Sequence, residues 1–135
     1  MRFETTRVLI IDDIEMARIV VKNMLLKLGV IESNIFELAN AKFAIDLIIK
    51  QGIDIVISDW SMPGMDGIDL LKEIRGNEQT REVFFVMTTS FSDRDKVEVA
   101  HNSGITDFLL KPFSFATFKE KLLKLVESQK SHNIN

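Results

Sequence analysis

The sequence predicts an α/β fold in which the strands of a parallel sheet alternate with helices along the whole chain. Short apolar runs recur from end to end, and each is followed by a longer segment with apolar residues at helical spacing. The runs are continuously apolar, which is typical of parallel strands covered by helices on both faces. The order is therefore (βα)5, a doubly wound sheet, and 135 residues fit one domain.

Five segments have the composition of buried strands. They cover residues 8–11, 35–38, 53–58, 83–87 and 108–110. Right-handed crossovers between parallel strands leave few topologies open for such an order.

Five helices are expected between and after these strands. They cover residues 17–28, 44–51, 66–76, 92–103 and 115–127. Gly29 is a plausible stop for the first helix, Asp66 a plausible cap for the third, and Ser92 with Asp95 resembles a capping box for the fourth. Residues 128–135 are polar, and we expect a loose tail there.

Composition excludes several classes of protein. The chain has no cysteine, so disulfides and Cys-based metal sites are excluded, which fits a reducing compartment. Its net charge of −3 argues against a basic face for nucleic acid. No apolar run approaches the ~20 residues of a membrane helix. The first residues are polar rather than signal-peptide-like, so we expect a cytoplasmic protein.

Polar residues follow four of the predicted strands, and carboxyl ends of parallel strands share one edge of a sheet. These residues are Asp12 and Asp13, then Asp59, then Thr88, Thr89 and Ser90, and finally Lys111 with Pro112. The order predicts that carboxylates, hydroxyls and one ammonium gather at that edge.

Carboxylates that converge repel one another and resist ionisation unless a cation is present. A ligand set of carboxylates favours a hard ion, and Mg²⁺ is the best candidate, with Mn²⁺ as a substitute. A carboxylate can also act as a nucleophile toward phosphorus and form an aspartyl phosphate. Lys111 could neutralise charge at the transferring group, and a hydroxyl from Thr89 could donate to a phosphoryl oxygen.

Three segments carry a resemblance to a known family. The runs Val8-Leu9-Ile10-Ile11-Asp12-Asp13, Ile57-Ser58-Asp59-Trp60-Ser61-Met62-Pro63-Gly64-Met65-Asp66-Gly67 and Leu110-Lys111-Pro112-Phe113 resemble the signatures of two-component response regulator receiver domains. Single-domain chemotaxis response regulators are the most similar members, over residues 6–127. The resemblance implies a flavodoxin-like sheet with strand order 2-1-3-4-5.

The resemblance also implies the roles of the acidic residues. Asp59 is the phosphoacceptor, and Asp13 and Asp59 bind the metal directly. Asp12 reaches the metal largely through water, and the backbone carbonyl of Ser61 is the remaining protein ligand. Lys111 pairs with the acids and then with the phosphoryl group.

A switch and a cis peptide bond are implied in the same way. Thr89 is the switch hydroxyl, and Phe108 is the switch aromatic, at a position where many members have Tyr. The bond between Lys111 and Pro112 is cis, a state accessible mainly to X-Pro bonds.

Simpler interpretations stand beside these roles. The pair Asp12-Asp13 alone could be a helix N-cap. A shift of one residue in the loop would give the role of Thr89 to Thr88 or Ser90. Phe108 could be core only, and Trp60 is interpreted as a packing residue. Having all three signatures at strand ends with the spacing of the family favours the functional interpretation.

The implied function is a phosphorylation switch rather than an enzyme. A histidine kinase or phosphotransfer protein would donate the phosphoryl group, and a protein target would bind near the fourth helix, fifth strand and fifth helix. Motility control is the commonest role of single-domain receivers. A relay intermediate, or a receiver fragment of a larger regulator, is the alternative. A Mg²⁺-dependent phosphohydrolase is more remote, because Ser61 stands where such enzymes carry a second catalytic Asp.

Two residues flank the attacking water when receivers of this family lose their phosphoryl group. Here they are Ser61 and Phe91. Neither offers a carboxylate or amide to orient water, so we expect slow self-dephosphorylation.

Overall fold

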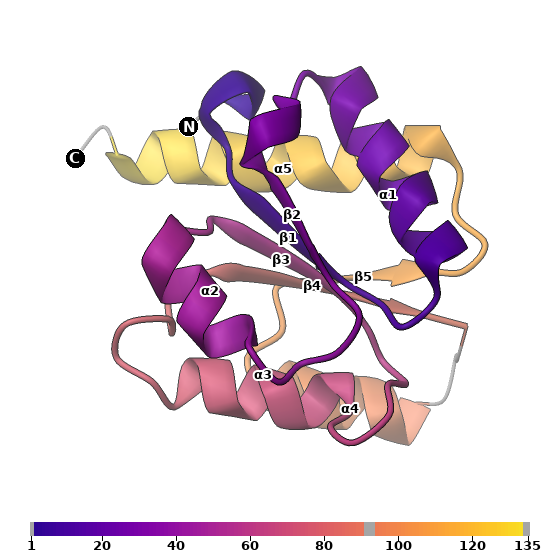
Figure 1. Ribbon diagram of the computed structural model, residues 1–135. Helices are drawn as coiled ribbons and strands as arrows, with labels where there is room; N and C mark the ends of the chain where they lie inside the picture. The colour runs from indigo at the N-terminus through magenta and orange to yellow at the C-terminus, as the bar shows by residue number, and fades with distance from the viewer. Residues whose placement is uncertain (1, 91–93, 134–135) are drawn as a thin grey trace.

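Five short strands form one parallel sheet in the computed structural model, which describes residues 2–90 and 94–133 (Figure 1). The strand order is β2-β1-β3-β4-β5, and every neighbouring pair is parallel. The order implied by the resemblance is thus confirmed. The strands are β1 (Val8–Ile11), β2 (Ile35–Leu38), β3 (Ile55–Asp59), β4 (Phe84–Thr89) and β5 (Asp107–Leu110).

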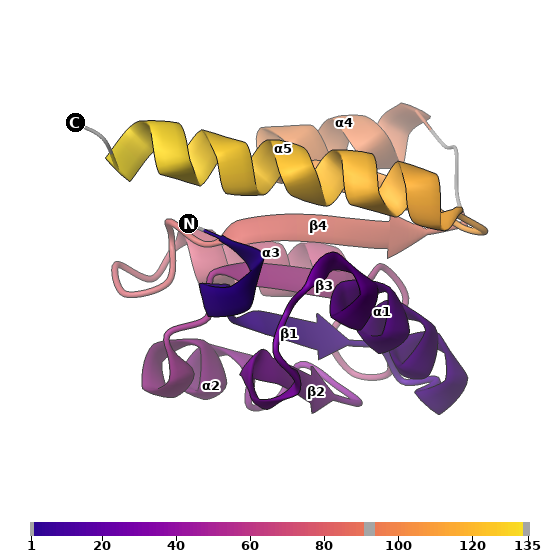
Figure 2. The same cartoon turned by 90° about the horizontal axis from the view of Figure 1, so that it is seen from above.

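Helices cover both faces of the sheet. Two of them, α1 (Glu15–Leu28) and α5 (Phe115–Asn133), lie on one face (Figure 1). The other three lie on the opposite face, and they are α2 (Ala44–Gln51), α3 (Gly67–Arg75) and α4 (Arg94–Asn102). In the view from above, the strands fan out beneath α5, with β2 at one edge of the sheet (Figure 2). Short 3-10 turns at Phe3–Thr5 and Glu32–Asn34 complete the elements.

Side chains of each central strand pack into two separate hydrophobic cores, one on either face of the sheet. In β1, Leu9 and Ile11 pack toward α2 and α3, whereas Val8 and Ile10 pack toward α1 and α5. All four side chains are almost fully buried. Full burial of such a side chain is worth about 1.5–3 kcal/mol. Burial on both faces is the reason that the strands are continuously apolar in the sequence.

Strands β3, β4 and β5 differ by one or two residues at their ends from the sequence prediction. Strand β3 begins at Ile55 rather than at residue 53, because the N–H of Ile53 donates to the carbonyl of Ile48 and completes the end of α2. Strand β4 continues past Met87 to Thr89, because its last residues pair with β3 and β5. The two threonines therefore belong to the strand and not to the loop.

Helix ends follow local chemistry. Gly29 ends α1 with φ of 105°, and its N–H donates to the carbonyls of Leu25 and Leu26. Asp66 caps α3, since its Oδ1 accepts from the N–H of Asp69 at 2.9 Å. The capping box expected at Ser92 lies outside the described residues. Helix α5 continues to Asn133, so the backbone of 128–133 is helical where a loose tail was expected. No Gly or Pro interrupts that segment.

Among residues 2–90 and 94–133, no helix is both long and apolar enough to cross a membrane.

Gly67 is the point of closest approach between α3 and the sheet. A Cβ at this position would lie 2.6 Å from Sδ of Met87 and 2.7 Å from the carbonyl oxygen of Asp59. The N–H of Gly67 donates to the carbonyl of Trp60 at 2.7 Å, which closes the loop 60–67. Only glycine allows this loop to return so close to the end of β3.

We predict that Gly67→Ala lowers the free energy of unfolding by about 1–3 kcal/mol, because the backbone of Asp59 must shift. Urea denaturation of the purified chain measures the change. Gly76→Ala is the control, because Gly76 has φ of −82° and a Cβ there would approach nothing closer than the carbonyl oxygen of Lys72 at 3.2 Å. A loss in Gly67→Ala no larger than that in Gly76→Ala would contradict the packing argument.

Candidate functional site

Polar side chains from several strand ends meet at one edge of the sheet. Strand β1 lies between β2 and β3, and Ile11 pairs with Ser58. The residues that follow them, Asp12 and Asp59, therefore emerge side by side. The sequence predicted this gathering from strand order, and the structure brings the residues together.

One carboxylate oxygen from each of Asp12, Asp13 and Asp59 lies within 4.8 Å of the other two. Asp12 is buried, Asp59 is half-buried and Asp13 is exposed. Within residues 2–90 and 94–133, this is the one group of three or more acidic or histidine side chains that could hold a metal ion. Three carboxylate oxygens at this spacing, open to solvent on one side, fit a hard divalent cation that retains water ligands.

Lys111 reaches the acids from the end of β5. Its Nζ lies 3.2 Å from Oδ2 of Asp12 and 3.3 Å from Oδ1 of Asp59. Its backbone N–H donates to the carbonyl of Thr89 at 2.7 Å, and the Lys111–Pro112 peptide bond is cis. One ammonium therefore contacts two carboxylates of a group of three, so the group has more acids than cations and favours a further cation.

Burial raises the pKa of the Asp59 carboxyl above its usual range, and repulsion from Asp12 acts in the same direction. The ammonium of Lys111 and the N–H of Trp60, which donates to Oδ1 at 2.9 Å, oppose this shift. The net direction shows that a single lysine does not compensate the cost of ionising Asp59 at this place. A bound cation would supply the missing compensation.

Asp12 is not a helix cap. The cap of α1 is Ile14, and no side chain caps that helix. Oδ1 of Asp12 instead accepts from the N–H of Ile14 at 2.9 Å, in a turn local to the loop. Oδ2 is the oxygen that faces Lys111. The simpler interpretation of the acidic pair as an N-cap is therefore wrong for Asp12.

The three hydroxyl residues at the end of β4, Thr88, Thr89 and Ser90, lie in different surroundings. Thr88 pairs with Asp59 in the sheet and, with Ser90, lines a cavity that Asp12 and Lys111 also line. Thr89 is buried and pairs with Leu110. Since successive strand residues point to opposite faces, Thr89 shares the face of Met87. The assignment of the switch hydroxyl to Thr89 stays a prediction.

Phe108 is half-buried and packs against the core that contains Met87, its neighbour across β4 and β5. It therefore lies on the same face of the sheet as Thr89. Trp60 is buried in that core too, with Nζ of Lys96 5.9 Å from its ring. Ser61 follows as an exposed loop residue, and Phe91 lies outside the described residues.

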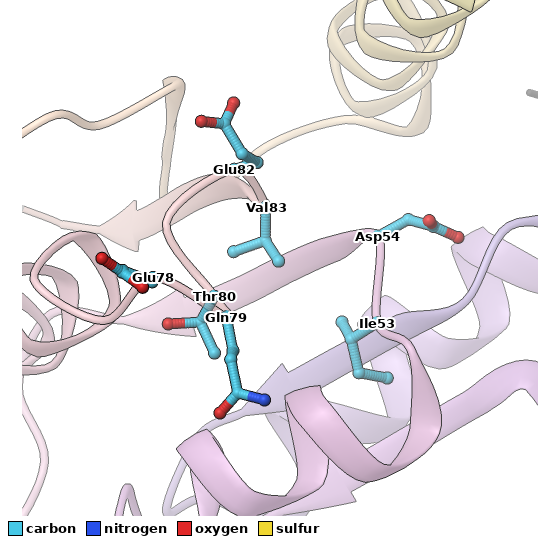
Figure 3. Close-up of a pocket in the computed structure, with 7 residues that line it drawn as sticks. All are labelled: Ile53, Asp54, Glu78, Gln79, Thr80, Glu82 and Val83. Atoms are coloured by element: carbon cyan, nitrogen blue, oxygen red, sulfur yellow. The ribbon is translucent and has the colours of Figure 1, made fainter.

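A second cavity lies at the opposite edge of the sheet, where β3 and β4 begin (Figure 3). Its acidic side chains are Asp54, Glu78 and Glu82, which Figure 3 shows pointing in different directions. Oδ2 of Asp54 accepts from the N–H of Arg7 at 2.8 Å. This group does not converge as the aspartates of the first site do, so the chemistry is concentrated at the carboxyl edge.

Sequence reasoning missed one residue that supports the acidic loop. Nη1 of Arg18 donates to the backbone carbonyl of Asp12 at 2.7 Å. The available signal was a cationic residue near the start of the helix that follows the acids. Charged residues on helices are usually solvated, so the sequence pattern alone did not distinguish Arg18 from a surface residue.

The fold and the acidic edge agree with the comparisons to known proteins. The family model described as response regulator receiver domain matches residues 8–123. The chain belongs to the response regulator receiver domain family, which serves two-component signalling.

Curated relatives cover nearly the whole chain. The chemotaxis protein CheY-3 of Vibrio cholerae is 40% identical over 121 residues, which are 90% of this chain and 92% of that protein. The chemotaxis protein CheY of Pseudomonas aeruginosa is 34% identical over 121 residues, 90% of this chain and 96% of that protein. Among solved structures, the chemotaxis response regulator CheY4 of Vibrio cholerae matches with a TM-score of 0.80 and 28% identity, covering 89% of this chain and 98% of that one.

We predict that the metal-free protein loses stability as the pH rises through the raised pKa of Asp59. The folded state holds this proton more tightly than the unfolded state, whose Asp pKa is about 3.9, so stability falls with pH between the two values. Asp59→Asn removes this part of the pH dependence. The variant should therefore be more stable than wild type at neutral pH in chelator, and the difference should vanish below about pH 4.

Urea denaturation between pH 3.5 and 8 in chelator measures this difference, and Asp46→Asn, an exposed acid on α2, is the control. Adding Mg²⁺ at ten times its dissociation constant should stabilise wild type by about 1.4 kcal/mol and leave Asp59→Asn unchanged. An Asp59→Asn variant less stable than wild type at neutral pH without metal would show that the burial of this charge is not costly.

Proposed function

We propose that this chain is a phosphorylation switch that accepts a phosphoryl group on Asp59 from a histidine kinase or a phosphotransfer protein. The observation that carries the proposal is the convergence of Asp12, Asp13 and Asp59, two of which, Asp12 and Asp59, contact the ammonium of Lys111. The site would change the state of the protein once per phosphorylation event and would not turn over a substrate.

Asp59 has the chemistry of the acceptor. One carboxylate oxygen attacks phosphorus while the bond from phosphorus to the donor nitrogen breaks. The bond's electron pair stays on that nitrogen, and because the second ring nitrogen of the phosphohistidine carries a proton, the donor leaves as neutral imidazole. The carboxylate must be ionised to attack, although burial favours its protonated form. Bound Mg²⁺, or Mn²⁺ in its place, supplies positive charge that favours the ionised carboxylate and offsets the charge of the phosphoryl group.

The remaining residues hold the reacting groups. Asp13, Asp59 and the carbonyl of Ser61 are the proposed direct ligands, with Asp12 acting largely through water. Lys111 already stands between Asp12 and Asp59, so its ammonium can move to a phosphoryl oxygen without crossing the site.

The switch is proposed to run from Thr89 to Phe108. Thr89 would donate to a phosphoryl oxygen, and the space that it leaves would favour an inward Phe108. Both residues belong to the same face of adjacent strands, which supports a coupling by packing. Phosphorylation shifts such an equilibrium only by its differential affinity for the two states. Because residue 108 is Phe, no hydroxyl there can bond to a partner.

A protein partner is proposed to bind at α4, β5 and α5. This surface exposes the apolar side chains of Val97 and Val99 on α4 and of Leu110 on β5. Next to Leu110, a cavity is lined by residues of β5, of the loop 111–114 and of α5. No nucleic acid is proposed as a partner, because the net charge is −3.

Motility control is the pathway that we propose, on the strength of the chemotaxis proteins among the relatives. A relay intermediate that passes its phosphoryl group onward uses the same site. The two roles differ in the acceptor and not in the chemistry of Asp59.

The proposal predicts a Mg²⁺-dependent change in the fluorescence of Trp60, the single tryptophan, which directly follows Asp59. A further change should follow addition of acetyl phosphate or a beryllofluoride mimic. Both changes should vanish in Asp59→Ala, and intact-mass analysis should find the acyl phosphate on Asp59. Phosphorylation of Asp59→Ala to the wild-type extent, or rapid turnover of assorted phosphate esters, would overturn the proposed function.

We also predict that Phe91→Glu loses its phosphoryl group several-fold faster than wild type, because a carboxylate there can orient the attacking water. Phosphoryl loss is followed by Trp60 fluorescence after removal of the donor. Ile31→Glu, which adds an acid at an exposed residue after α1, is the control. Equal or slower loss in Phe91→Glu would refute the role of residue 91.

A further inference from the structure

We infer that Arg18 is a positioning residue for the proposed metal-binding loop, residues 12–14. Its guanidinium holds the backbone of this loop so that the carboxylate of Asp13 is placed to bind the ion. The inference rests on the Mg²⁺ site of the proposed function, and it concerns a residue that neither touches the ion nor reacts.

Arg18 holds the peptide unit between the two acids. Its Nη1 donates to the carbonyl oxygen of Asp12 at 2.7 Å, a short charge-assisted bond. A peptide group is rigid and planar, so a fixed carbonyl also fixes the direction in which the chain continues to the Cα of Asp13. The side chain of Asp13 is exposed, so packing cannot perform this task.

The other hydrogen bonds of the loop act on other groups, and the one from the N–H of Ile14 to Oδ1 of Asp12 holds the peptide unit that follows Asp13. The N–H of Asp12 donates to the carbonyl of Leu38 at 3.1 Å. Its two carboxylate oxygens face the N–H of Ile14 and the ammonium of Lys111. The bond from Arg18 is the contact that ties the carbonyl side of Asp12 to helix α1.

Arg18 is itself anchored. Its Nε lies 3.3 Å from Oε1 of Glu37 on β2, and 16% of its side chain is exposed. Oε2 of Glu37 lies 3.9 Å from Nζ of Lys22, one turn further along α1. Glu37 therefore orients the guanidinium, and the planar fork can hold the carboxylate and the carbonyl together.

A charge effect of Arg18 and a positioning effect would change the Mg²⁺ affinity in opposite directions, which makes the role testable. If Arg18 acted only through its positive charge, its removal would strengthen Mg²⁺ binding, because a cation near the ion repels it. If Arg18 acts by holding the loop, its removal weakens binding. Groups that orient metal ligands in this way typically change metal affinity by about 10–100-fold.

The experiment is a Mg²⁺ titration of the full chain, followed by Trp60 fluorescence and by calorimetry. We expect Arg18→Met to weaken Mg²⁺ binding about 10-fold or more. Arg18→Lys keeps the positive charge, but an ammonium cannot hold the carbonyl of Asp12 and the carboxylate of Glu37 with the geometry of a planar guanidinium. Mg²⁺ binding should therefore also be weaker in this variant, by a smaller factor. Lys22→Met is the control, because it removes a cation that also neighbours Glu37 and leaves the bond to Asp12 intact.

A second readout separates positioning from a general loss of stability. In metal-free protein, amide NMR signals of Asp13 and Ile14 should shift or broaden in Arg18→Lys and stay in place in Lys22→Met. Unchanged binding in Arg18→Lys with tighter binding in Arg18→Met would overturn the inference and leave only a charge effect. A wild-type chain that binds no Mg²⁺ would instead overturn the proposed function.

Discussion

The cost of holding the half-buried Asp59 beside Asp12 is the constraint on which the rest of the structure depends. Burial and the neighbouring charge of Asp12 raise the pKa of the Asp59 carboxyl although Lys111 contacts both acids, so ionising Asp59 disfavours the folded state. Favourable burial elsewhere has to hold them together. The two cores supply it, because the central strands bury nearly every side chain on both faces. The acids stand where those buried strands end, so burial in the cores holds them in place.

Because these charges are unfavourable, ligands that compensate them would change the stability of the folded state. A cation at this edge would relieve the repulsion, and the ammonium of Lys111 could pair with a phosphoryl group in the proposed function. The threonines that end β4 and Phe108 on β5 belong to the same sheet as Asp59. In the proposed switch, a change at Asp59 would therefore pass through paired strands. The loop 60–67, closed at Gly67, and the clamp of Arg18 on Asp12 hold the same edge from the two sides of the sheet.

Much of this could be predicted from the sequence because the strong signals are local. Gly29 and Asp66 end and begin helices by their own backbone and side-chain preferences, and the continuously apolar run of β1 requires two covered faces. Boundaries set by pairing were less accessible. Thr89 belongs to β4 only because Leu110 lies opposite it, and Ile53 belongs to the end of α2 because its N–H reaches Ile48. Leu110 is far from Thr89 in the sequence. Ile48 lies only five residues before Ile53, but the apolar run that continues from Ile53 into β3 masks this local bond.

The sequence by itself determined the class of fold, the strand ends at which acids, hydroxyls and a lysine stand, and the family to which they belong. These follow from the periodicity of apolar residues and from motifs that are contiguous in the chain. Only the tertiary structure decided how the groups meet. The distance from Lys111 to Asp12 and Asp59, the raised pKa of Asp59 and the bond from Arg18 to Asp12 depend on burial and on contacts between distant segments. Burial and Coulomb forces act through space, and separation along the chain does not measure them.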